Sequence, residues 1–511
     1  MASAAAPARP HPHTELPAAA KPPLHVQSQH PQRKRVLFVT SEFADLIKCG
    51  GLGDVSAALP RALSAQHDIR VLIPGYQQVV DSGRPIRIVG HLPGLAALPP
   101  CRIGRMDLAD GLIVYVLLNP VLYERDGSPY VDPQGNDWAD NHIRFARLGL
   151  AAAEIAAGSA GIQWRPELVH ANDWPAAMAP AYMAWQRVAA PALLTIHNLA
   201  YQGMCDMACS SELAIPEAAC GIEGMEFHGR LSFLKAGIAY AAHATTVSRR
   251  YAWEITTEQF GCGLEGMLRA KVQAGQLSGI INGIDESWQP ESDPHLLQGF
   301  GPRDWAGKQA NAEHVARWLG LDDDGPLFGV VSRLVQQKGI DLTLAVAEHI
   351  VARGGRIAVI GRGEPALEAA MVELGERHPG RIGVHIGFNE CDARRLYAGS
   401  DFLLMPSRFE PCGLSQMYAQ RYASLPIARR TGGLADTIED GVSGFLFDAP
   451  QVDDYRIAIE RALQVYTHPE LLEAMRCRAM QAPPYWRQSV QPYDRLYQRL
   501  LSQTSARREL R

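Results

Sequence analysis

The chain has 511 residues, which is too long for one ordinary hydrophobic core and favours two domains. Hydrophobic residues make up 47% and charged residues 20%, as in a soluble globular protein, and the net charge of −5 argues against nucleic-acid binding, which needs a basic surplus or stripe. The most apolar stretch, residues 148–160, consists mainly of small residues and contains Glu154, so we expect a packed helix and no membrane span.

The first 34 residues are rich in alanine and proline and lack the continuous apolar block of a secretory signal. We expect them to form a disordered tail. The nine cysteines are scattered, and the closest pair, Cys205 and Cys209, has no second pair beside it. This pattern predicts reduced thiols, a cytoplasmic location and no metal site.

From residue 35 onward, short runs of β-branched and apolar residues alternate with helical stretches, which predicts α/β domains with parallel, doubly wound sheets. The rhythm pauses at residues 282–294 and then restarts. We therefore predict a first domain over 35–284, a second over 285–488 and a C-terminal helix over 489–511. The predicted strands are 36–40, 69–73, 167–169, 193–196, 245–248 and 279–281 in the first domain, and 327–332, 356–360, 382–386, 402–405 and 425–428 in the second.

Ligands of such sheets bind at the carboxyl ends of the strands, so unusual residues there are candidates for a site. After the first strand, Lys48 precedes a glycine cluster that contains Gly50 and Gly51 and leads to Asp54. Clustered glycines before a helix let backbone N–H groups approach an anion, although a plain strand-to-helix turn would look the same.

Three further polar residues follow strands of the first domain. Asp173 and His197 would lie on one rim of the sheet as a titratable floor, and Asn282 ends the last short run. Taken singly, each of the three is also compatible with a satisfied core residue.

In the second domain, Arg333 and Lys338 follow the first strand. Two cations at a strand end suit a diphosphate leaving group, whose developing charge needs fixed positive partners; a solvated helix start is the alternative. Gly387 and Phe388 follow another strand, where the ring could stack on a nucleobase or fill the core.

Two segments later in the second domain combine polar groups with a helix start. Glu410 precedes Pro411, and residues Cys412, Gly413 and Leu414 lead into a helix whose first N–H groups are free. A carboxylate there can hold sugar hydroxyls while the amides take phosphate. One strand later, Thr431 and Gly432 repeat the arrangement, and a capped helix is the alternative in both places.

These segments resemble the glycogen and starch synthase family. The similar motifs are K-C-G-G-L-G-D-V, T-I-H-N-L-A-Y-Q-G, N-G-I-D, S-R-L-V-Q-Q-K-G, S-R-F-E-P-C-G-L-S-Q and R-R-T-G-G-L-A-D-T, in that order from about residue 35 to 501. The resemblance implies a GT-B glycosyltransferase, with two Rossmann-like domains facing across a cleft and the last helix crossing back to the first domain. It also implies an ADP-glucose donor, an α-1,4-glucan acceptor, retention of configuration, and neither metal nor cofactor.

The resemblance also implies roles for individual residues. Lys48 and the glycine loop would approach the donor phosphates and sugar, with Asp173 and His197 near the transferred glucose. Arg333 and Lys338 would neutralise the diphosphate. Glu410 with the amides of Cys412 and Gly413 would hold glucose hydroxyls, and Phe388 would lie near adenine.

The sequence departs from the family pattern at two positions. Cys49 stands where the family has threonine, and Asn172 stands where it often has histidine, which leaves the role of Asn172 open. UDP-glucose is an alternative donor. A nicotinamide-dependent oxidoreductase is a more distant alternative, suggested by the G-x-G-x-x-A pattern of Gly361, Gly363 and Ala366, although no acidic residue follows at the required spacing.

Overall fold

The structure is a computed structural model that describes residues 1–2 and 33–509. Lys34–Arg511 forms one compact unit, which contains all the elements below. The predicted tail lies outside the described residues except at its two ends. Lys34, which the prediction assigned to the tail, already belongs to strand β1.

The first domain is built on a nine-stranded sheet, whose central strands β1 and β6 are almost entirely buried. β5, β4 and β3 pair antiparallel at one edge, an extension that the strand prediction missed, and every other pair is parallel. In sheet order the strands are β12 (Leu277–Gly279), β11 (His243–Thr246), β7 (Ala192–Ile196), β6 (Leu168–Asn172), β1 (Lys34–Val39), β2 (His67–Pro74), β5 (Ile113–Leu118), β4 (Cys101–Asp107) and β3 (Arg87–Leu92).

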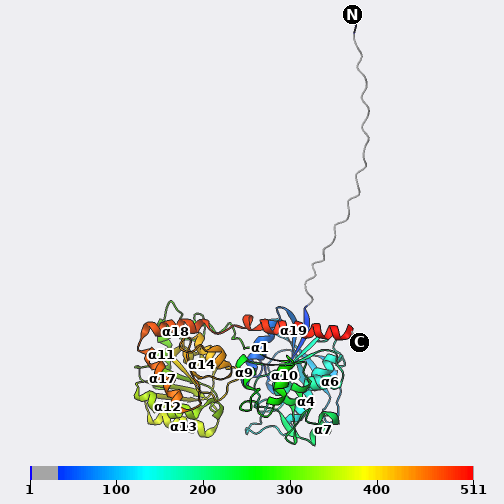
Figure 1. The fold of residues 1–511 in the computed structure, drawn as a ribbon, viewed down its shortest axis with the longest axis horizontal. Helices are drawn as coiled ribbons and strands as arrows, with labels where there is room; N and C mark the ends of the chain where they lie inside the picture. Colours follow the sequence, from blue (N-terminus) through cyan, green and yellow to red (C-terminus); the bar gives the residue numbers. More distant parts are fainter. Residues whose placement is uncertain (3–32, 510–511) are drawn as a thin grey trace. The chain divides into compact units, whose positions relative to one another are not determined.

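Helices and a small second sheet complete the first domain (Figure 1). The apolar stretch at 148–160 lies mostly in the buried helix α4 (Asn141–Ala157), and no helix among the described residues is long and apolar enough to cross a membrane. The remaining elements are α1 (Gly51–Leu63), α2 (Gln77–Val80), α3 (Pro120–Tyr123), α5 (Asp173–Ala176), α6 (Met178–Trp185), α7 (Cys209–Glu212), α8 (Phe233–Tyr240), α9 (Arg249–Glu254), α10 (Glu265–Gln273), η1 (Glu217–Ala219) and the three-stranded sheet β8 (Met204–Asp206), β10 (Arg230–Ser232) and β9 (Glu226–Phe227).

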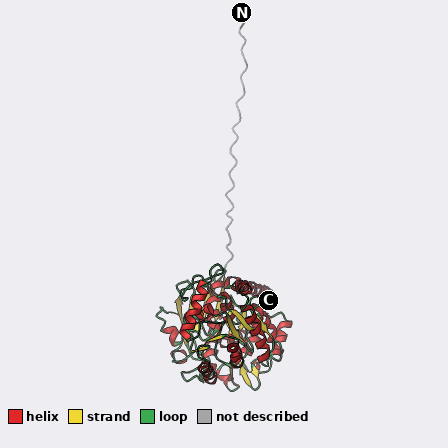
Figure 2. Cartoon of the chain, turned by 90° about the vertical axis from the view of Figure 1, so that its left-hand side faces the viewer, coloured by secondary structure: helices red, strands yellow, loops and turns green. Residues whose placement is uncertain are grey.

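The second domain has a six-stranded, fully parallel sheet surrounded by helices (Figure 2). Its order is β15 (Ile382–Ile386), β14 (Arg356–Gly361), β13 (Leu327–Val331), β16 (Phe402–Met405), β17 (Leu425–Arg429) and β18 (Phe445–Phe447). Its helices are α11 (Ala306–Leu319), η2 (Gln336–Lys338), α12 (Ile340–Ala352), α13 (Pro365–Arg377), α14 (Glu390–Gly399), α15 (Ser415–Arg421), α16 (Gly432–Thr437), α17 (Val452–Tyr466) and α18 (Pro469–Gln481).

Both sheets reverse their winding at a switch point, as the predicted doubly wound fold requires. In the second sheet the chain order is 3-2-1-4-5-6, and the direction of winding changes between β13 and β16. In the first sheet it changes between β1 and β6. The crevice outside the carboxyl ends of such strand pairs is where ligands of these folds bind.

The chain crosses between the domains twice, and the two crossing segments pair with each other. Ile284 N–H donates to Pro484 C=O (2.9 Å), and Trp486 N–H donates back to Ile284 C=O (3.3 Å). The second crossing leads into α19 (Trp486–Glu509), which begins three residues before the predicted start. Its apolar stripe packs into the core of the first domain through Trp486, Val490, Tyr493, Leu496, Tyr497 and Leu500.

Candidate active site

The glycine loop after β1 is organised by a buried carboxylate that the sequence analysis did not single out. Glu42 is 3% exposed, and its Oε2 accepts hydrogen bonds from the backbone N–H groups of Cys49 (2.6 Å) and Gly50 (2.9 Å). Its Oε1 accepts from the Tyr130 hydroxyl (2.6 Å). Burial raises the pKa of Glu42, while these donors oppose the shift. These three hydrogen bonds hold the loop in place, and the only signal for Glu42 in the local sequence is an acid three residues after the end of β1.

The loop carries an ion pair and lies beside the second domain. Lys48 Nζ is 2.6 Å from Asp54 Oδ1, and both side chains are about one-third exposed. Burial raises the pKa of Asp54 and Lys48 counteracts it, while Glu390 and Asp285 of the second domain add a smaller upward contribution. A β-carbon placed on Gly51 would lie 3.7 Å from Leu414 Cδ1, so the first-domain loop meets the start of α15.

Asp173 is the first residue beyond β6 and has a strained backbone. Its φ is +57°, a left-handed conformation that non-glycine residues seldom adopt. Its side chain is 7% exposed, and Oδ1 accepts from the Trp174 N–H (2.8 Å). Burial is the main reason why the pKa of Asp173 rises to about 7. A buried carboxyl with a pKa near neutrality at a strand end has the features of a functional group.

Asn172 joins the ends of three neighbouring strands and orients His197. Its Nδ2 donates to the Val39 carbonyl (3.1 Å), and its Oδ1 accepts from His197 Nε2 (3.2 Å). Burial lowers the pKa of His197 to about 3, so the ring is neutral near pH 7. The Asn172 side chain therefore bridges the ends of β6, β1 and β7. The predicted end of this strand at residue 169 is wrong, because β6 continues to Asn172 and His170 is a buried strand residue.

In the second domain, Lys338 and Glu410 form a close ion pair between the ends of β13 and β16. Lys338 Nζ is 2.5 Å from Glu410 Oε2, which also accepts from Ser407 Oγ (3.0 Å). Glu410 is 5% exposed. The approach depends on Gly339, whose φ is +68° and whose β-carbon would fall 2.1 Å from the Pro406 carbonyl oxygen. Glycine is needed here for both its conformation and its size.

Arg333 occupies the same turn but faces solvent. Arg333 is exposed, and its side chain donates a long hydrogen bond to Gln337 Oε1 (3.4 Å). Gln337 in turn donates to the Phe409 carbonyl (3.2 Å). The two predicted cations thus share one turn and differ in setting: Lys338 is paired, whereas Arg333 is available.

The segment after Glu410 is enclosed. Cys412 is 5% exposed, and burial raises the pKa of its thiol to about 12, so the thiol stays protonated. Asn282, from the first crossing between the domains, lies against this thiol. Gly413 has φ +72° and lies against the Gln416 side chain. At the β15 edge of the sheet, Gly387 directly follows β15 with φ +156°, and Phe388 is 61% exposed, which leaves its ring open to a ligand.

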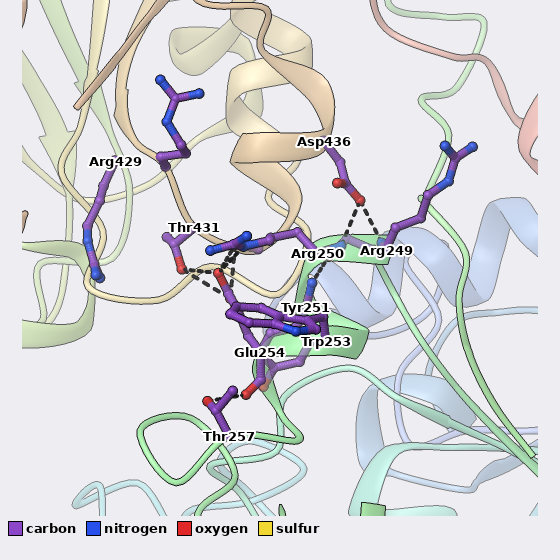
Figure 3. A network of polar contacts seen from close by, with 12 residues as sticks. Arg249, Arg250, Tyr251, Trp253, Glu254, Thr257, Arg429, Thr431 and Asp436 are labelled. Atoms are coloured by element: carbon purple, nitrogen blue, oxygen red, sulfur yellow. Dashed lines mark hydrogen bonds and ion pairs between the residues drawn. The ribbon is translucent and has the colours of Figure 1, made fainter. Parts of the chain in front are cut away.

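The sequence predicts that Thr431 and Gly432 begin a helix whose first N–H groups are free to bind a ligand, but the structure differs. The Thr431 hydroxyl and the Gly432 N–H both donate to the carboxylate of Glu254 in the first domain (3.0–3.3 Å; Figure 3). These donors are therefore already satisfied by the protein. Glu254 is a further residue that the sequence analysis missed, because its partners lie about 180 residues away.

A possible metal-binding group lies apart from the predicted site residues. Within the described part of the chain, the group of His, Cys, Asp and Glu side chains close enough to share an ion is His142, Cys209 and Glu212, on α4 and α7. None of the three belongs to the elements that carry the ion pairs described above.

Two Rossmann-like domains whose switch points carry buried carboxylates and lysines define a glycosyltransferase of GT-B type, and two family models agree with this class. The starch synthase catalytic domain matches residues 35–270, and glycosyl transferases group 1 matches residues 313–481. A glycogen synthase of Pseudomonas paraeruginosa is 64% identical over 94% of each chain, and one of Pseudomonas putida is 66% identical over 94% of this chain and 92% of its own. The chain belongs to the glycogen and starch synthase family.

Solved structures give the same result. The catalytic domain of starch synthase IV from Arabidopsis thaliana, bound to ADP and acarbose, matches with a TM-score of 0.82 and 29% identity over 92% of this chain and 100% of its own. The oxidoreductase alternative is wrong. Gly361 and Gly363, which suggested that alternative, instead permit close packing of the backbone. β-Carbons on these residues would fall 2.3 Å and 2.2 Å from the carbonyl oxygens of Ser332 and Leu334.

Proposed function

We propose that this glycogen synthase transfers glucose from ADP-glucose to the terminal 4-hydroxyl group of an α-1,4-glucan with retention of configuration. The observation that carries the proposal is the pairing of Lys338 with Glu410 at the switch point of the second sheet. At this position the lysine can bind the phosphates of a nucleotide sugar, and the carboxylate can bind the hydroxyl groups of its sugar. The relative bound to ADP and acarbose supports the same choice of donor and acceptor.

The leaving group would be stabilised by protein cations. Arg333 and Lys338 from the second domain and Lys48 from the first would surround the diphosphate. As the glycosidic bond breaks, negative charge moves onto the phosphate, so fixed cations lower the energy of the transition state more than that of the bound substrate. Lys48 and Lys338 are each held by a carboxylate, Asp54 and Glu410, which keeps their ammonium groups in place before the donor binds.

The transferred glucose would lie between the two sheet edges. Glu410 and the amides of Cys412 and Gly413 would bind its 3- and 4-hydroxyls, and the neutral ring of His197 would bind the 6-hydroxyl. Asp173 would face the sugar from the first domain. Asn282 and Leu414 would border the sugar, with Gly387 and Phe388 beside adenine. We give Thr431 and Gly432 a supporting role, because Glu254 already accepts from both.

Retention would follow from attack on the same face that the diphosphate leaves. A retaining glycosidase uses two carboxylates about 5 Å apart to form a covalent intermediate. Here the departing phosphate would itself take the proton from the acceptor hydroxyl while the cations hold the ion pair together. The positive charge comes from Lys48, Arg333 and Lys338, so the proposal requires no metal ion.

The test is transfer of labelled glucose to glycogen with ADP-glucose and UDP-glucose measured side by side. We expect a higher kcat/KM with ADP-glucose, an α-linked product, and activity that persists after chelation of divalent ions. Equal or better turnover with UDP-glucose would contradict the donor assignment. Loss of activity in chelator that magnesium or manganese restores would contradict the role of the three cations.

A further inference from the structure

Two short helices from different domains cap each other at the interface. α9 follows β11 in the first domain, and α16 follows β17 in the second. Each helix carries a carboxylate near its C-terminal end that reaches the N-terminal N–H groups of the other. We call the two helices with Glu254 and Asp436 the reciprocal cap (Figure 3).

The first half of the reciprocal cap is Glu254 of α9. It is 1% exposed, and its two oxygens accept from the Thr431 hydroxyl (3.2 and 3.3 Å) and the Gly432 N–H (3.0 and 3.1 Å). Arg250 Nε lies 3.1 Å from Oε1 and balances its charge. A buried carboxylate that accepts from three donors is held in one position.

The second half is Asp436 of α16. Its Oδ2 accepts from the backbone N–H groups of Arg249 (2.6 Å) and Arg250 (3.2 Å), the first residues of α9. Ser248, the N-cap residue of α9, accepts from the Tyr251 N–H and donates its own proton across the interface to the Pro411 carbonyl (2.5 Å). Both helix starts are therefore satisfied by the opposite domain.

The reciprocal cap is hydrogen-bonded to the backbone carbonyls of Glu410 and Pro411. Ser248 binds the Pro411 carbonyl from the first domain, and the Gly433 N–H binds the Glu410 carbonyl (3.0 Å) from α16. The contact is close, since a β-carbon on Gly432 would fall 1.9 Å from the Glu410 carbonyl oxygen. A shift of either helix would therefore move the backbone that carries the Glu410 carboxylate and the Cys412 and Gly413 amides.

We infer that Glu254 and Asp436 are positioning residues for glucosyl transfer. Their hydrogen bonds hold α9 against α16. Through the contacts of Ser248 and Gly433, the position of these two helices determines where residues 410–413 lie relative to the first domain. The inference rests on the proposed role of that segment in holding the glucose. Because a small misplacement of reacting groups costs far more in the transition state than in the bound substrate, the effect falls on kcat.

The experiment compares Glu254→Ala, Asp436→Ala and the double variant in the full chain. The control is Asp401→Ala. Asp401 likewise accepts from a backbone N–H, that of Leu327 (2.8 Å), and pairs with an arginine, Arg476, but it does so within the second domain and before β16. All four variants are first checked by calorimetry and assayed well below their unfolding temperatures.

We expect each cap variant to lower kcat about tenfold or more, the double variant to be within about threefold of the worse single one, and Asp401→Ala to keep kcat near wild type. Glu254→Gln and Asp436→Asn keep one acceptor oxygen and should recover most of the rate. If the alanine variants do not fold, Ser248→Ala replaces them; it removes the hydroxyl that donates to the Pro411 carbonyl and should also lower kcat. Cap variants no slower than the control, or losses that multiply independently, would overturn the inference.

A second measurement separates failure of this inference from failure of the proposed function. Small-angle X-ray scattering of the wild type and the double variant reports the domain arrangement without any substrate. We expect a larger radius of gyration for the double variant, and this expectation does not depend on which nucleotide sugar is the donor. An unchanged radius together with wild-type kcat would leave Glu254 and Asp436 with no positioning role.

Discussion

Arg333 and Lys338 share one turn, yet their removal should have different consequences. Arg333 is exposed, so Arg333→Ala should leave the unfolding temperature unchanged. We expect kcat at saturating ADP-glucose to fall about a hundredfold or more, since loss of one charge-stabilising group costs roughly 3–4 kcal/mol in the transition state. Lys338→Ala should reduce kcat on the same scale and also destabilise the fold, because it leaves the buried carboxylate of Glu410 unpaired.

Steady-state kinetics and differential scanning calorimetry on the two variants test this difference. Gln336→Ala, an exposed change in the same turn, serves as the control for damage to the turn itself. If kcat stays near wild type in both variants and only the donor KM rises, the two cations bind substrate and transition state equally, and the proposed leaving-group role is wrong.

Asp173 should make the stability of the protein depend on pH. Its pKa is about 7 in the folded protein and near 3.8 in the unfolded chain, so the folded state binds the extra proton. Its contribution is therefore destabilising above pH 7 and disappears as the pH falls from about 7 to about 4. Asparagine cannot ionise, tolerates a left-handed backbone and can still accept from the Trp174 N–H.

We therefore expect Asp173→Asn to raise the unfolding temperature at pH 8 relative to wild type and to lose most, but not all, of that advantage at pH 5. Thermal unfolding in matched buffers measures the difference. Activity should fall at both values, because the carboxylate faces the proposed sugar site. A stability difference that is constant from pH 5 to pH 8 would show that Asp173 does not titrate in this range.

At the scale of elements, α19 makes a fully buried polar contact with the first domain within its apolar stripe, and Asp494 and Arg499 add part-buried contacts to His67 (2.9 Å) and His243 (3.2 Å). The Tyr497 hydroxyl is 2.7 Å from His170 Nδ1, and His170 Nε2 is 2.6 Å from Thr195 Oγ1. Tyr497→Phe keeps the packing and leaves the buried Nδ1 without its partner, which should cost about 1–3 kcal/mol in the free energy of unfolding. Urea unfolding measures this cost.

The exposed Tyr201→Phe is the matched control, since it removes a hydroxyl that is not in the core. Its unfolding midpoint should match that of the wild type. An equally small effect for Tyr497→Phe would show that the Tyr497 hydroxyl adds nothing to the docking of the helix.

The elements that could be predicted from sequence are those with strong local patterns. Buried parallel strands such as β1 and β13 are continuous apolar runs, so they were found within one or two residues. β6 was predicted too short because His170 and Asn172 are polar, although both are buried residues in the last part of the strand. The edge strands β3 and β4 were missed because their alternating polar residues resemble connecting segments, whereas β5 is a continuous apolar run that the strand prediction overlooked.

The residues of the candidate site likewise fall into those that the sequence could identify and those that it could not. Residues in the segments that follow a strand, such as Asp173 and Lys338, could be picked out by position, and the structure gives both of them unusual settings. Glu42 and Glu254 could not, because their importance comes from backbone donors that folding brings to them. Sequence likewise gave no means of knowing that Glu254 would occupy the donors of Thr431 and Gly432.

At the scale of the whole molecule, the two domains are joined where the crossing segments pair, and this pairing requires a glycine. A β-carbon on Gly283 would fall 2.4 Å from Trp486 N and 2.6 Å from its Cα, so it meets backbone that cannot rotate away. The backbone of Gly283 is not left-handed, so a larger residue is excluded here only by lack of space. Any side chain must therefore push the start of α19 away from Ile284.

Gly283→Ala should consequently disturb the arrangement of the domains more than the domains themselves. We expect a loss of about 1–3 kcal/mol in stability, typical of an overpacked contact, together with a fall in kcat because Lys48 and Lys338 come from opposite sides of the crossing. Gly266→Ala, on α10 with nothing within 4 Å of the added carbon, is the matched control and should be neutral or slightly stabilising. Calorimetry and transfer assays on both variants separate the two effects. If Gly283→Ala loses stability but keeps wild-type kcat, the crossing stabilises the molecule without setting the geometry of the site.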